Sequence, residues 1–238
     1  MKRLSSNQRN FPLRCFFSQF LFSKKLSSGR LFALGFLIIL SAQLAGQDLQ
    51  TNVTLDRQVE KFLKENKNTF RDMNVPEKDG ELLYDLILKG KYTRALEIGT
   101  STGYSGIYMA WALSKTGGKL ITIEINESRH KTALKNFEEA GLSDYIDARL
   151  ADAHVVVKEL PGPFDFVFSD ADKNWYTRYF DFLDPKLEVG GCYTTHNISE
   201  DRGGWNYDYL QYIRSLDHYD SKIHPGSSML ISYKKADK

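Results

Sequence analysis

Short apolar segments alternate with longer segments of helical pattern along most of the chain. Five apolar runs have the length of strands, and helical segments lie between them. Strands that alternate with helices predict an α/β fold, a mostly parallel sheet with helices on both faces. Near the C-terminus, Pro225-Gly226-Ser227 joins two further strand-like runs, which indicates an antiparallel hairpin and brings the sheet to seven strands. The expected strands are residues 95–98, 119–124, 145–150, 164–169, 190–195, 219–224 and 228–233.

Two segments of helical pattern precede the first expected strand. Residues 55–70 carry apolar side chains at helical spacing, and residues 80–88 form a second helix that ends at Gly90. We expect this pair to cover one edge of the domain or its site. The sequence then divides into a targeting segment over 1–46, a helical cap over 47–90 and a core over 91–238.

The N-terminal segment has the layout of a secretory signal. The apolar run Leu31 to Leu40 follows Lys24, Lys25 and Arg30, and small residues lead from it to Gly46. The run is shorter than the roughly 20 apolar residues of a membrane span. Export to the periplasm or the medium is the favoured reading. An uncleaved membrane anchor through residues 31–46 and an organellar transit peptide remain open, and a cytoplasmic location is less favoured.

Charge is distributed unevenly. The whole chain has a net charge of +2, but residues 1–46 hold seven basic and no acidic side chains, which leaves 25 basic and 30 acidic side chains in the remainder. A domain without a basic excess is not typical of a nucleic-acid binder. Beyond the targeting segment, which contains Cys15, Cys192 is the single thiol, and its strand-like surroundings favour a small buried core residue.

The stretch RALEIGTSTGYS, residues 94–105, reads as strand, glycine turn and helix. Such a turn places free backbone N–H groups and a helix N-terminus at the carboxyl end of a strand, where polar ligands bind. Its glycines, Gly99 and Gly103, lack the G-x-G-x-x-G spacing of dinucleotide-binding proteins, so a dehydrogenase is the least favoured enzyme class. Glu97 suits a positively charged ligand, and Glu124, at the end of the next strand, suits ribose hydroxyls.

These residues resemble motif I of class I S-adenosylmethionine-dependent methyltransferases, and LEIGTSTGYS is similar to the catechol and caffeoyl-CoA O-methyltransferase-like family. The resemblance extends from about Val75 to the C-terminus. It implies a Rossmann-like fold, S-adenosylmethionine as cofactor, and a helical cap that often takes part in a homodimer. Against the adenine ring it places Asp152 and Ala153, although Asp152 is equally a helix cap. The other residues expected at the cofactor are Glu97, Gly99, Thr100, Ser101, Gly103, Ser105, Glu124, Asp170 and Asp172.

The sequence Asp170-Ala171-Asp172-Lys173 follows the apolar strand 164–169. Two carboxylates and an amine at one strand end are costly unless they are solvated, paired or bound to a cation. In the family, the first aspartate binds a divalent metal, the second lies near the cofactor, and the lysine lies near the acceptor oxygen. The resemblance gives these roles to Asp170, Asp172 and Lys173, and a simple capped helix start is the structural alternative.

The pair His196-Asn197 departs from the family, which carries Asp-Asn as metal ligands at this strand end. Mg²⁺ prefers oxygen ligands, whereas Asp170, His196 and Asn197 together suit Mn²⁺, Fe²⁺, Co²⁺ or Zn²⁺ better. Alternatively the site holds no metal and His196 is the general base. The metal-free reading is slightly favoured. The acceptor loop that follows, residues 199–206, is short and contains Trp205.

The motifs together predict an O-methyltransferase that acts on a small hydroxylated acceptor, aromatic acceptors included. An exported binding protein without turnover on a methyltransferase scaffold is the first alternative, because the metal aspartate is replaced and the methyl donor is made in the cytosol. A membrane-associated methyltransferase that acts on protein or lipid is the second.

Overall fold

The computed structural model describes residues 53–201 and 206–238. The chain divides into two units, 1–47 and 48–238, and every described residue belongs to the second. The predicted targeting segment over 1–46, with Cys15, lies outside the described residues, as do residues 202–205 of the predicted acceptor loop, Trp205 among them. In the described part, no helix combines the length and apolar character that crossing a bilayer requires.

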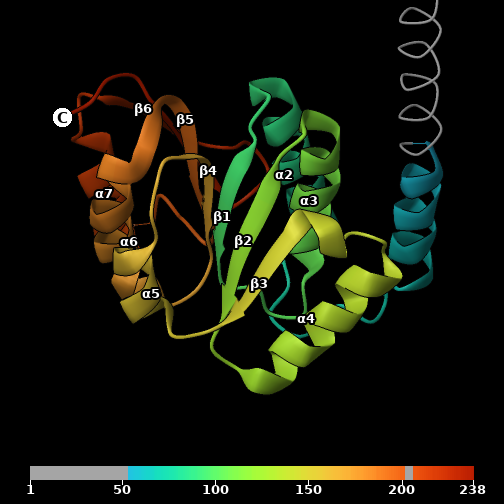
Figure 1. Cartoon of the computed structure of the whole chain (residues 1–238). Coiled ribbons are helices and arrows are strands. Elements are labelled where there is room, and N and C mark those ends of the chain that lie inside the picture. Colours follow the sequence, from blue (N-terminus) through green and yellow to red (C-terminus); the bar gives the residue numbers. More distant parts are fainter. Residues whose placement is uncertain (1–52, 202–205) are drawn as a thin grey trace, which may run out of the picture. The chain divides into compact units, whose positions relative to one another are not determined.

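A seven-stranded sheet forms the centre of the domain (Figure 1). The strand order is β3-β2-β1-β4-β5-β7-β6, with parallel pairing from β3 to β5 and antiparallel pairing of β7 with both β5 and β6. The predicted Rossmann-like α/β fold with its C-terminal hairpin is therefore confirmed. The strands are β1 (Arg94–Ile98), β2 (Lys119–Glu124), β3 (Ile146–Leu150), β4 (Phe164–Ser169), β5 (Leu187–Thr195), β6 (Tyr219–Ile223) and β7 (Leu230–Lys234).

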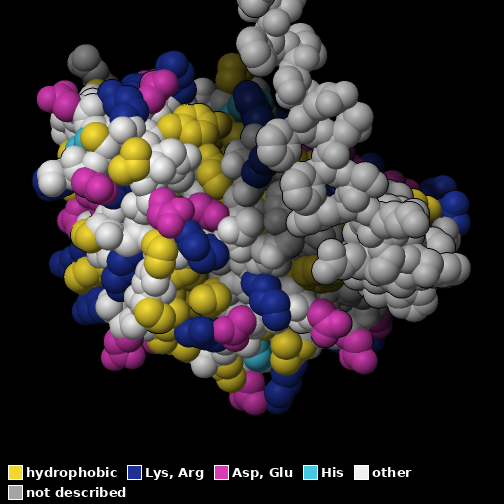
Figure 2. Space-filling model, turned by 45° about the horizontal axis from the view of Figure 1, so that its top comes forward, with side chains coloured by type: hydrophobic (Ala, Val, Ile, Leu, Met, Phe, Trp, Pro, Cys, Tyr) yellow, Lys and Arg dark blue, Asp and Glu magenta, His cyan; other side chains and the backbone are white. Residues whose placement is uncertain are grey.

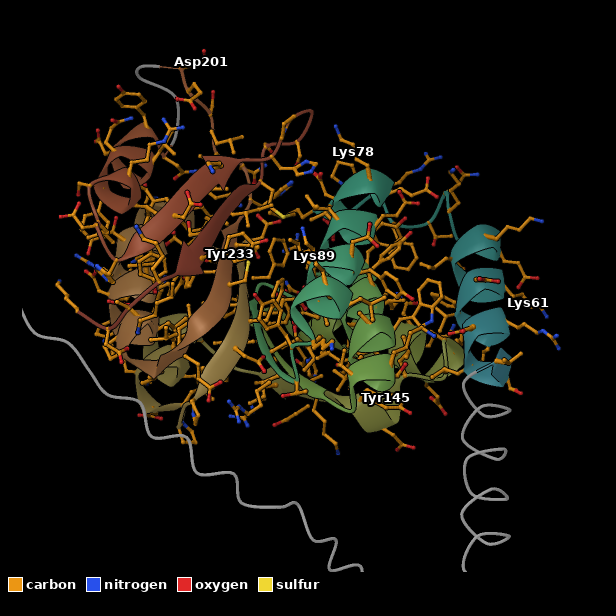
Figure 3. All side chains as sticks on the ribbon, turned by 90° about the horizontal axis from the view of Figure 1, so that it is seen from above. Lys61, Lys78, Lys89, Tyr145, Asp201 and Tyr233 are labelled. Carbon is orange, nitrogen blue, oxygen red and sulfur yellow. The ribbon has the colours of Figure 1, made fainter. Side chains whose placement is uncertain are left out.

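Helices cover both faces of the sheet, as the view along its edge shows (Figure 3). The helix over residues 53–65 and helices α2, α3 and α4 lie on one side, and α5, α6 and α7 lie on the other. Alternate residues of β1 pack into the two cores, Ala95 on the α2–α3 side and Leu96 and Ile98 on the other. The helix bounds are α2 (Glu77–Gly90), α3 (Tyr104–Thr116), α4 (Glu127–Glu139), α5 (Ala153–Glu159), α6 (Tyr176–Leu183) and α7 (Tyr207–Arg214).

The two helices of the cap differ from their predicted bounds. The first ends at residue 65 rather than 70, because the side chain of Asn66 donates to the carbonyl of Phe62 and closes the last turn. The second begins at Glu77 rather than 80, directly after Pro76, a residue that favours the start of a helix over its interior. The segment between the helices is therefore longer than predicted, and it reaches the site described below.

Cys192 lies fully buried in the core beside α2 and α3, as predicted. Burial raises the pKa of its thiol, because a thiolate there would lose its hydration. The buried thiol is therefore a packing residue.

Candidate active site

A cavity of about 480 Å³ opens at the carboxyl edge of the parallel strands. Ligands of open α/β sheets bind at this edge, where the loops after neighbouring strands meet. The lining residues come from the end of β2, from the loops after β1 to β5, from α4, α5 and α6, and from the segment before α2. They are Met73, Asn74, Gly99, Ser101, Ile123, Glu124, Ile125, Arg129, Ala151, Asp152, Ala153, His154, Asp170, Ala171, Asp172, Lys173, Tyr179, His196 and Asn197.

Two glycines fix the turn after β1. Gly99 has φ +101°, and a Cβ on it would lie 2.6 Å from the carbonyl oxygen of Asp170. Gly103 has φ +94°, and a Cβ there would lie 2.7 Å from the ring of Phe137 on α4. Both positions therefore require glycine. The first allows the turn to approach the end of β4, and the second allows α4 to pack against the start of α3.

Glu97 lies behind the turn rather than in the cavity. Its side chain is fully buried, and its carboxylate accepts hydrogen bonds from the hydroxyls of Ser105 and Thr122, each at 2.5 Å. Burial raises the pKa of Glu97 to about 8, although the two hydroxyls oppose this shift. Glu97, which the sequence predicts to contact a charged ligand, does not line the cavity, because its carboxylate is directed to the hydroxyls of Ser105 and Thr122.

Three other residues predicted at the cofactor also stay outside the cavity lining. The hydroxyl of Thr100 pairs with that of Thr122 at 2.5 Å, Ser105 contacts Glu97, and Gly103 packs on α4. The side chains of Thr100 and Ser105 therefore face the inside of the strand-turn-helix unit and stabilise its conformation. Only Gly99 and Ser101 of this turn line the cavity.

Glu124, predicted to contact the ribose of the cofactor, lies in the cavity wall. Its two carboxylate oxygens accept the backbone N–H groups of Ser101 and Asn126, each at 2.8 Å. Ser101 has φ +48°, and its hydroxyl donates to the carbonyl of Asp72 at 2.6 Å. A carboxylate that receives one donor on each oxygen keeps further acceptor capacity, so Glu124 can accept from two neighbouring hydroxyls of a ligand.

One end of the cavity is formed by the start of α5. Asp152 caps this helix by accepting the N–H of His154 at 2.9 Å, and Asp152 and Ala153 also line the cavity, so the two readings of Asp152 are compatible. His154 was missed by the sequence analysis. Its ring stacks on Trp175 at a centroid distance of 3.9 Å, and its ring nitrogens lie 3.3 Å from Asp152 and from Asp172. The signal was its place directly after Asp152 and Ala153.

The opposite end holds a chain of ion pairs. Lys173 Nζ lies 2.5 Å from Asp170 Oδ1, and His196 Nδ1 lies 3.1 Å from Asp170 Oδ2. The other ring nitrogen of His196, Nε2, lies 3.1 Å from Oδ2 of Asp79 on α2. Burial lowers the pKa of His196, but the hydrogen bonds and charges of Asp170 and Asp79 outweigh it and raise the pKa above its ordinary value.

Asp79 was not expected at the site. It is 2% exposed, lies in the first turn of α2 and also accepts the hydroxyl of Ser227 at 2.6 Å. An acidic residue near a helix start has an ordinary explanation in the helix dipole, so the sequence carried no signal for this contact.

These contacts do not fit a divalent metal at Asp170, His196 and Asn197. An imidazole that binds a metal presents a lone pair on one nitrogen. Here both nitrogens of His196 face carboxylates, and both oxygens of Asp170 are engaged, Oδ1 by the amine of Lys173 and Oδ2 by Nδ1 of His196. Asn197 is exposed at the cavity with φ +57°. Within residues 53–201 and 206–238, no group of three or more His, Cys, Asp or Glu is placed to hold a metal.

The predicted role of His196 as general base does not fit either. A base needs a free lone pair within reach of the acceptor proton. Each ring nitrogen of His196 lies 3.1 Å from a carboxylate oxygen, so neither nitrogen is open to an acceptor hydroxyl in this arrangement.

The segment before α2 forms the rim of the cavity. Arg129 on α4 binds Asp72 through two contacts of 2.9 and 3.1 Å, and Asn74 donates to the hydroxyl of Thr102 at 2.8 Å. Met73 lies between them with φ +50° and is 72% exposed. These contacts attach the segment to the glycine turn and to α4, and they place an adaptable thioether side chain at the cavity mouth.

The surface charges are mixed. On the face shown in Figure 2, lysine and arginine alternate with aspartate and glutamate, without an extended basic area. That face therefore offers no charged track of the kind that binds a phosphate backbone.

Comparisons with known proteins all point to O-methyltransferases. A family model described as O-methyltransferase matches residues 50–201. A catechol O-methyltransferase of Niastella koreensis is 35% identical over 133 residues, which cover 54% of this chain and 60% of that protein. Caffeoyl-CoA O-methyltransferase 1 of Eucalyptus globulus is 32% identical over 145 residues, 59% of this chain and 56% of that protein. The chain thus matches less than two thirds of the length of these relatives.

Among solved structures, an O-methyltransferase from Bacillus cereus in complex with S-adenosylhomocysteine aligns with a TM-score of 0.63. The two sequences are 25% identical, and the alignment covers 75% of this chain and 91% of the other.

Proposed function

The chain belongs to the O-methyltransferase family, and we propose that it transfers a methyl group from S-adenosylmethionine to a hydroxyl of a small acceptor. The observation that carries this proposal is the position of Glu124, whose carboxylate is fixed by two backbone N–H groups in the wall of a cavity at the strand ends. The same cavity is lined by Asp170 and Lys173. The cavity has Glu124 at its cofactor end and Asp170 and Lys173 at its acceptor end. The presence of both sets of residues favours an enzyme over a protein that only binds the cofactor.

The cofactor half of the cavity lies between the glycine turn and α5. S-adenosylmethionine supplies a methyl group on a positively charged sulfur. Glu124 would accept hydrogen bonds from the ribose hydroxyls, and Asp152, Ala153 and His154, which line the same cavity, would border the adenine. Gly99 and Ser101 present their backbone to the amino-acid end. The carboxylate of Asp172 lies on the same wall and offsets the positive charge.

The acceptor half lies at Lys173 and Asn197. The acceptor hydroxyl would release its proton to water, and the side-chain amine of Lys173, in its charged form, would hold the resulting oxyanion. The oxyanion would form a bond to the methyl carbon while the methyl–sulfur bond breaks with its electron pair remaining on sulfur. Asp170, 2.5 Å from that amine, holds it in place. Holding donor and acceptor in line is the main contribution of the protein to such a displacement. Relatives named for catechol and caffeoyl-CoA make aromatic hydroxyls the first acceptors to test.

Location and assembly form a separate part of the proposal. The apolar run of residues 31–40 supports export or anchoring in a membrane through residues 31–46. The cap helices support a homodimer by family resemblance. Fractionation of cells that express the full chain, with N-terminal sequencing of the product, tests the first point, and light scattering of the purified protein tests the second.

Calorimetric titration of S-adenosylhomocysteine into the full chain tests the cofactor site. We expect binding on the order of micromolar and a loss of about tenfold or more in Glu124→Gln, because hydrogen bonds to a charged group are lost. Glu138→Gln, on the exposed side of α4, is the matched control and should bind like the wild type. Methyl transfer to catechol is measured in parallel. Absence of binding to the wild type would reject the proposed function.

A further inference from the structure

The ring of His196 lies between two carboxylates, an arrangement that a neutral imidazole does not explain. Each ring nitrogen lies 3.1 Å from a carboxylate oxygen, Nδ1 at Asp170 and Nε2 at Asp79. A neutral imidazole has one N–H and one lone pair, so one carboxylate would face a lone pair. An imidazolium donates to both. The geometry therefore selects the cationic ring.

Charge balance leads to the same state. Asp79 and Asp170 carry two negative charges, and Lys173 and the imidazolium of His196 carry two positive charges. Asp79 is 2% exposed, and an unpaired carboxylate at that depth is strongly destabilising. Within the described part of the chain, the other side chain that donates to Asp79 is the neutral hydroxyl of Ser227. Asp79 thus requires the positive charge of His196.

A divalent cation would have to compete with this arrangement. To bind Asp170 it would displace Lys173 from Oδ1 or His196 from Oδ2, and it would place its two charges beside the imidazolium. Like charges at such separations repel strongly in a partly buried site. The position next to Asp170 is already occupied by a cation that belongs to the protein.

Asp79 reaches the site because two contacts with the β6–β7 turn hold the start of α2. Ser227 in the β6–β7 turn donates to its Oδ1, and the neighbouring Lys78 donates to the carbonyl of Gly226 in the same turn. Lys78 lies at the end of α2 that faces this turn (Figure 3). The carboxylate is fixed before any ligand binds.

Resting on the proposed function, we propose that the imidazolium of His196, held by Asp79, supplies beside Asp170 the positive charge that a divalent cation would otherwise supply. Methyl transfer by this protein then proceeds without a divalent cation. Asp79 is a positioning residue for His196, and the imidazolium, which lines the cavity with Lys173, favours the negative charge that develops on the acceptor oxygen.

Three measurements on the full chain test the inference, and two of them need no turnover. The first is electron paramagnetic resonance of Mn²⁺ added to the wild type and to His196→Asp. We expect the wild type to leave Mn²⁺ free at millimolar concentrations and His196→Asp to bind it, because the substitution removes a cation and adds a carboxylate. Binding of Mn²⁺ to the wild type at the same concentrations overturns the inference.

The second is ¹⁵N NMR of the histidine rings at neutral pH, with the His196 signals assigned by their loss in His196→Asn. Two protonated ring nitrogens are expected in the wild type. In Asp79→Asn the ring loses one carboxylate partner and should become neutral. Asp85→Asn, an exposed position on the same helix, is the control and should leave the signals unchanged. A single protonated nitrogen in the wild type contradicts the inference.

The third is the rate of methyl transfer to catechol with EDTA, Mg²⁺ or Mn²⁺. We expect equal rates in all three, and in Asp79→Asn a fall in kcat of about 10-fold with an unchanged KM for S-adenosylmethionine, the usual size of effect for a residue that orients an active group. A rate abolished by EDTA and restored by a cation rejects the inference. If no acceptor is methylated, the proposed function fails, whereas Mn²⁺ binding and the ring protonation still decide the cation question.

Discussion

Glu97 and His196 are both buried and titratable, but they contact different groups. Glu97 meets only neutral hydroxyls, so burial dominates and its pKa rises to about 8. His196 meets two carboxylates, which outweigh burial and raise its pKa as well. The neutral form of Glu97 and the charged form of His196 are therefore the favoured ones, and each preference follows from the atoms that the side chain contacts.

Glu97→Gln should change the pH dependence of stability in the cofactor-free protein. The folded state keeps a proton on Glu97 up to about pH 8, whereas the unfolded chain loses it near its ordinary pKa, so the wild type loses stability as pH rises between these values. We expect the free energies of unfolding of the variant and the wild type to be similar near pH 4.5. At pH 8 the variant should be more stable by a few kcal/mol, because each tenfold difference in proton affinity between the folded and unfolded states corresponds to about 1.4 kcal/mol. Urea denaturation at several pH values measures this. A difference that stays constant with pH contradicts it.

His196→Asn tests the second buried group. Because the folded-state pKa is raised, the stabilising effect of the ion pairs is complete below the ordinary pKa of histidine and is lost as pH rises through the raised value. The wild type should exceed the variant in stability most at pH 5.5 to 6, and the excess should shrink at higher pH. Denaturation of both proteins between pH 5.5 and 9 gives the result, and an excess that grows with pH would show a neutral ring in the folded state.

The elements show where sequence patterns succeed and where they stop. Strands 119–124 and 164–169 were predicted to the residue, because apolar runs buried on both faces end where the chain turns polar. Helix ends were less accurate. The cap helix stopped early at Asn66, whose side chain bonds to the backbone of Phe62, and β5 begins three residues before its predicted start at Gly190. Such contacts involve single side chains and leave no periodic pattern.

Gly103→Ala should damage the packing of the glycine turn against α4. A methyl group there meets the ring of Phe137 at 2.7 Å, and φ is +94°. Gly117, at the end of α3, also has a positive φ, +76°, but has no atom within 4 Å of the added Cβ. We expect Gly117→Ala to cost about 1 kcal/mol from backbone strain alone. Gly103→Ala should cost about 1–3 kcal/mol more because of overpacking. Thermal unfolding of both variants compares them, and equal losses would show that α4 shifts to make room.

At the scale of the whole domain, the site combines residues at the ends of the parallel strands with residues from the helical cap. Glu124, Asp170 and Asn197 were predicted because parallel strands bring their carboxyl ends to one edge. Asp79 and Asp72 could not be predicted, because each comes from the cap, and the position of the cap over the sheet depends on tertiary packing. The sequence thus predicted the part of the site that the sheet builds and missed the part that the cap completes.

Arg129→Met should loosen the rim of the cavity without unfolding the protein. Arg129 and Asp72 attach the segment that carries Met73 to α4, and both side chains are partly exposed, so their ion pair adds little to global stability. It does hold the rim over the cofactor half of the cavity. We expect S-adenosylhomocysteine to dissociate about two- to fivefold faster, the effect of one partly exposed pair, with a nearly unchanged melting temperature. Lys131→Met, on the same helix in an exposed pair with Glu127, is the matched control and should leave dissociation unchanged. Stopped-flow displacement measures the rate. Equal rates in the wild type and Arg129→Met would mean that the segment stays closed through Ser101 and Asn74 alone.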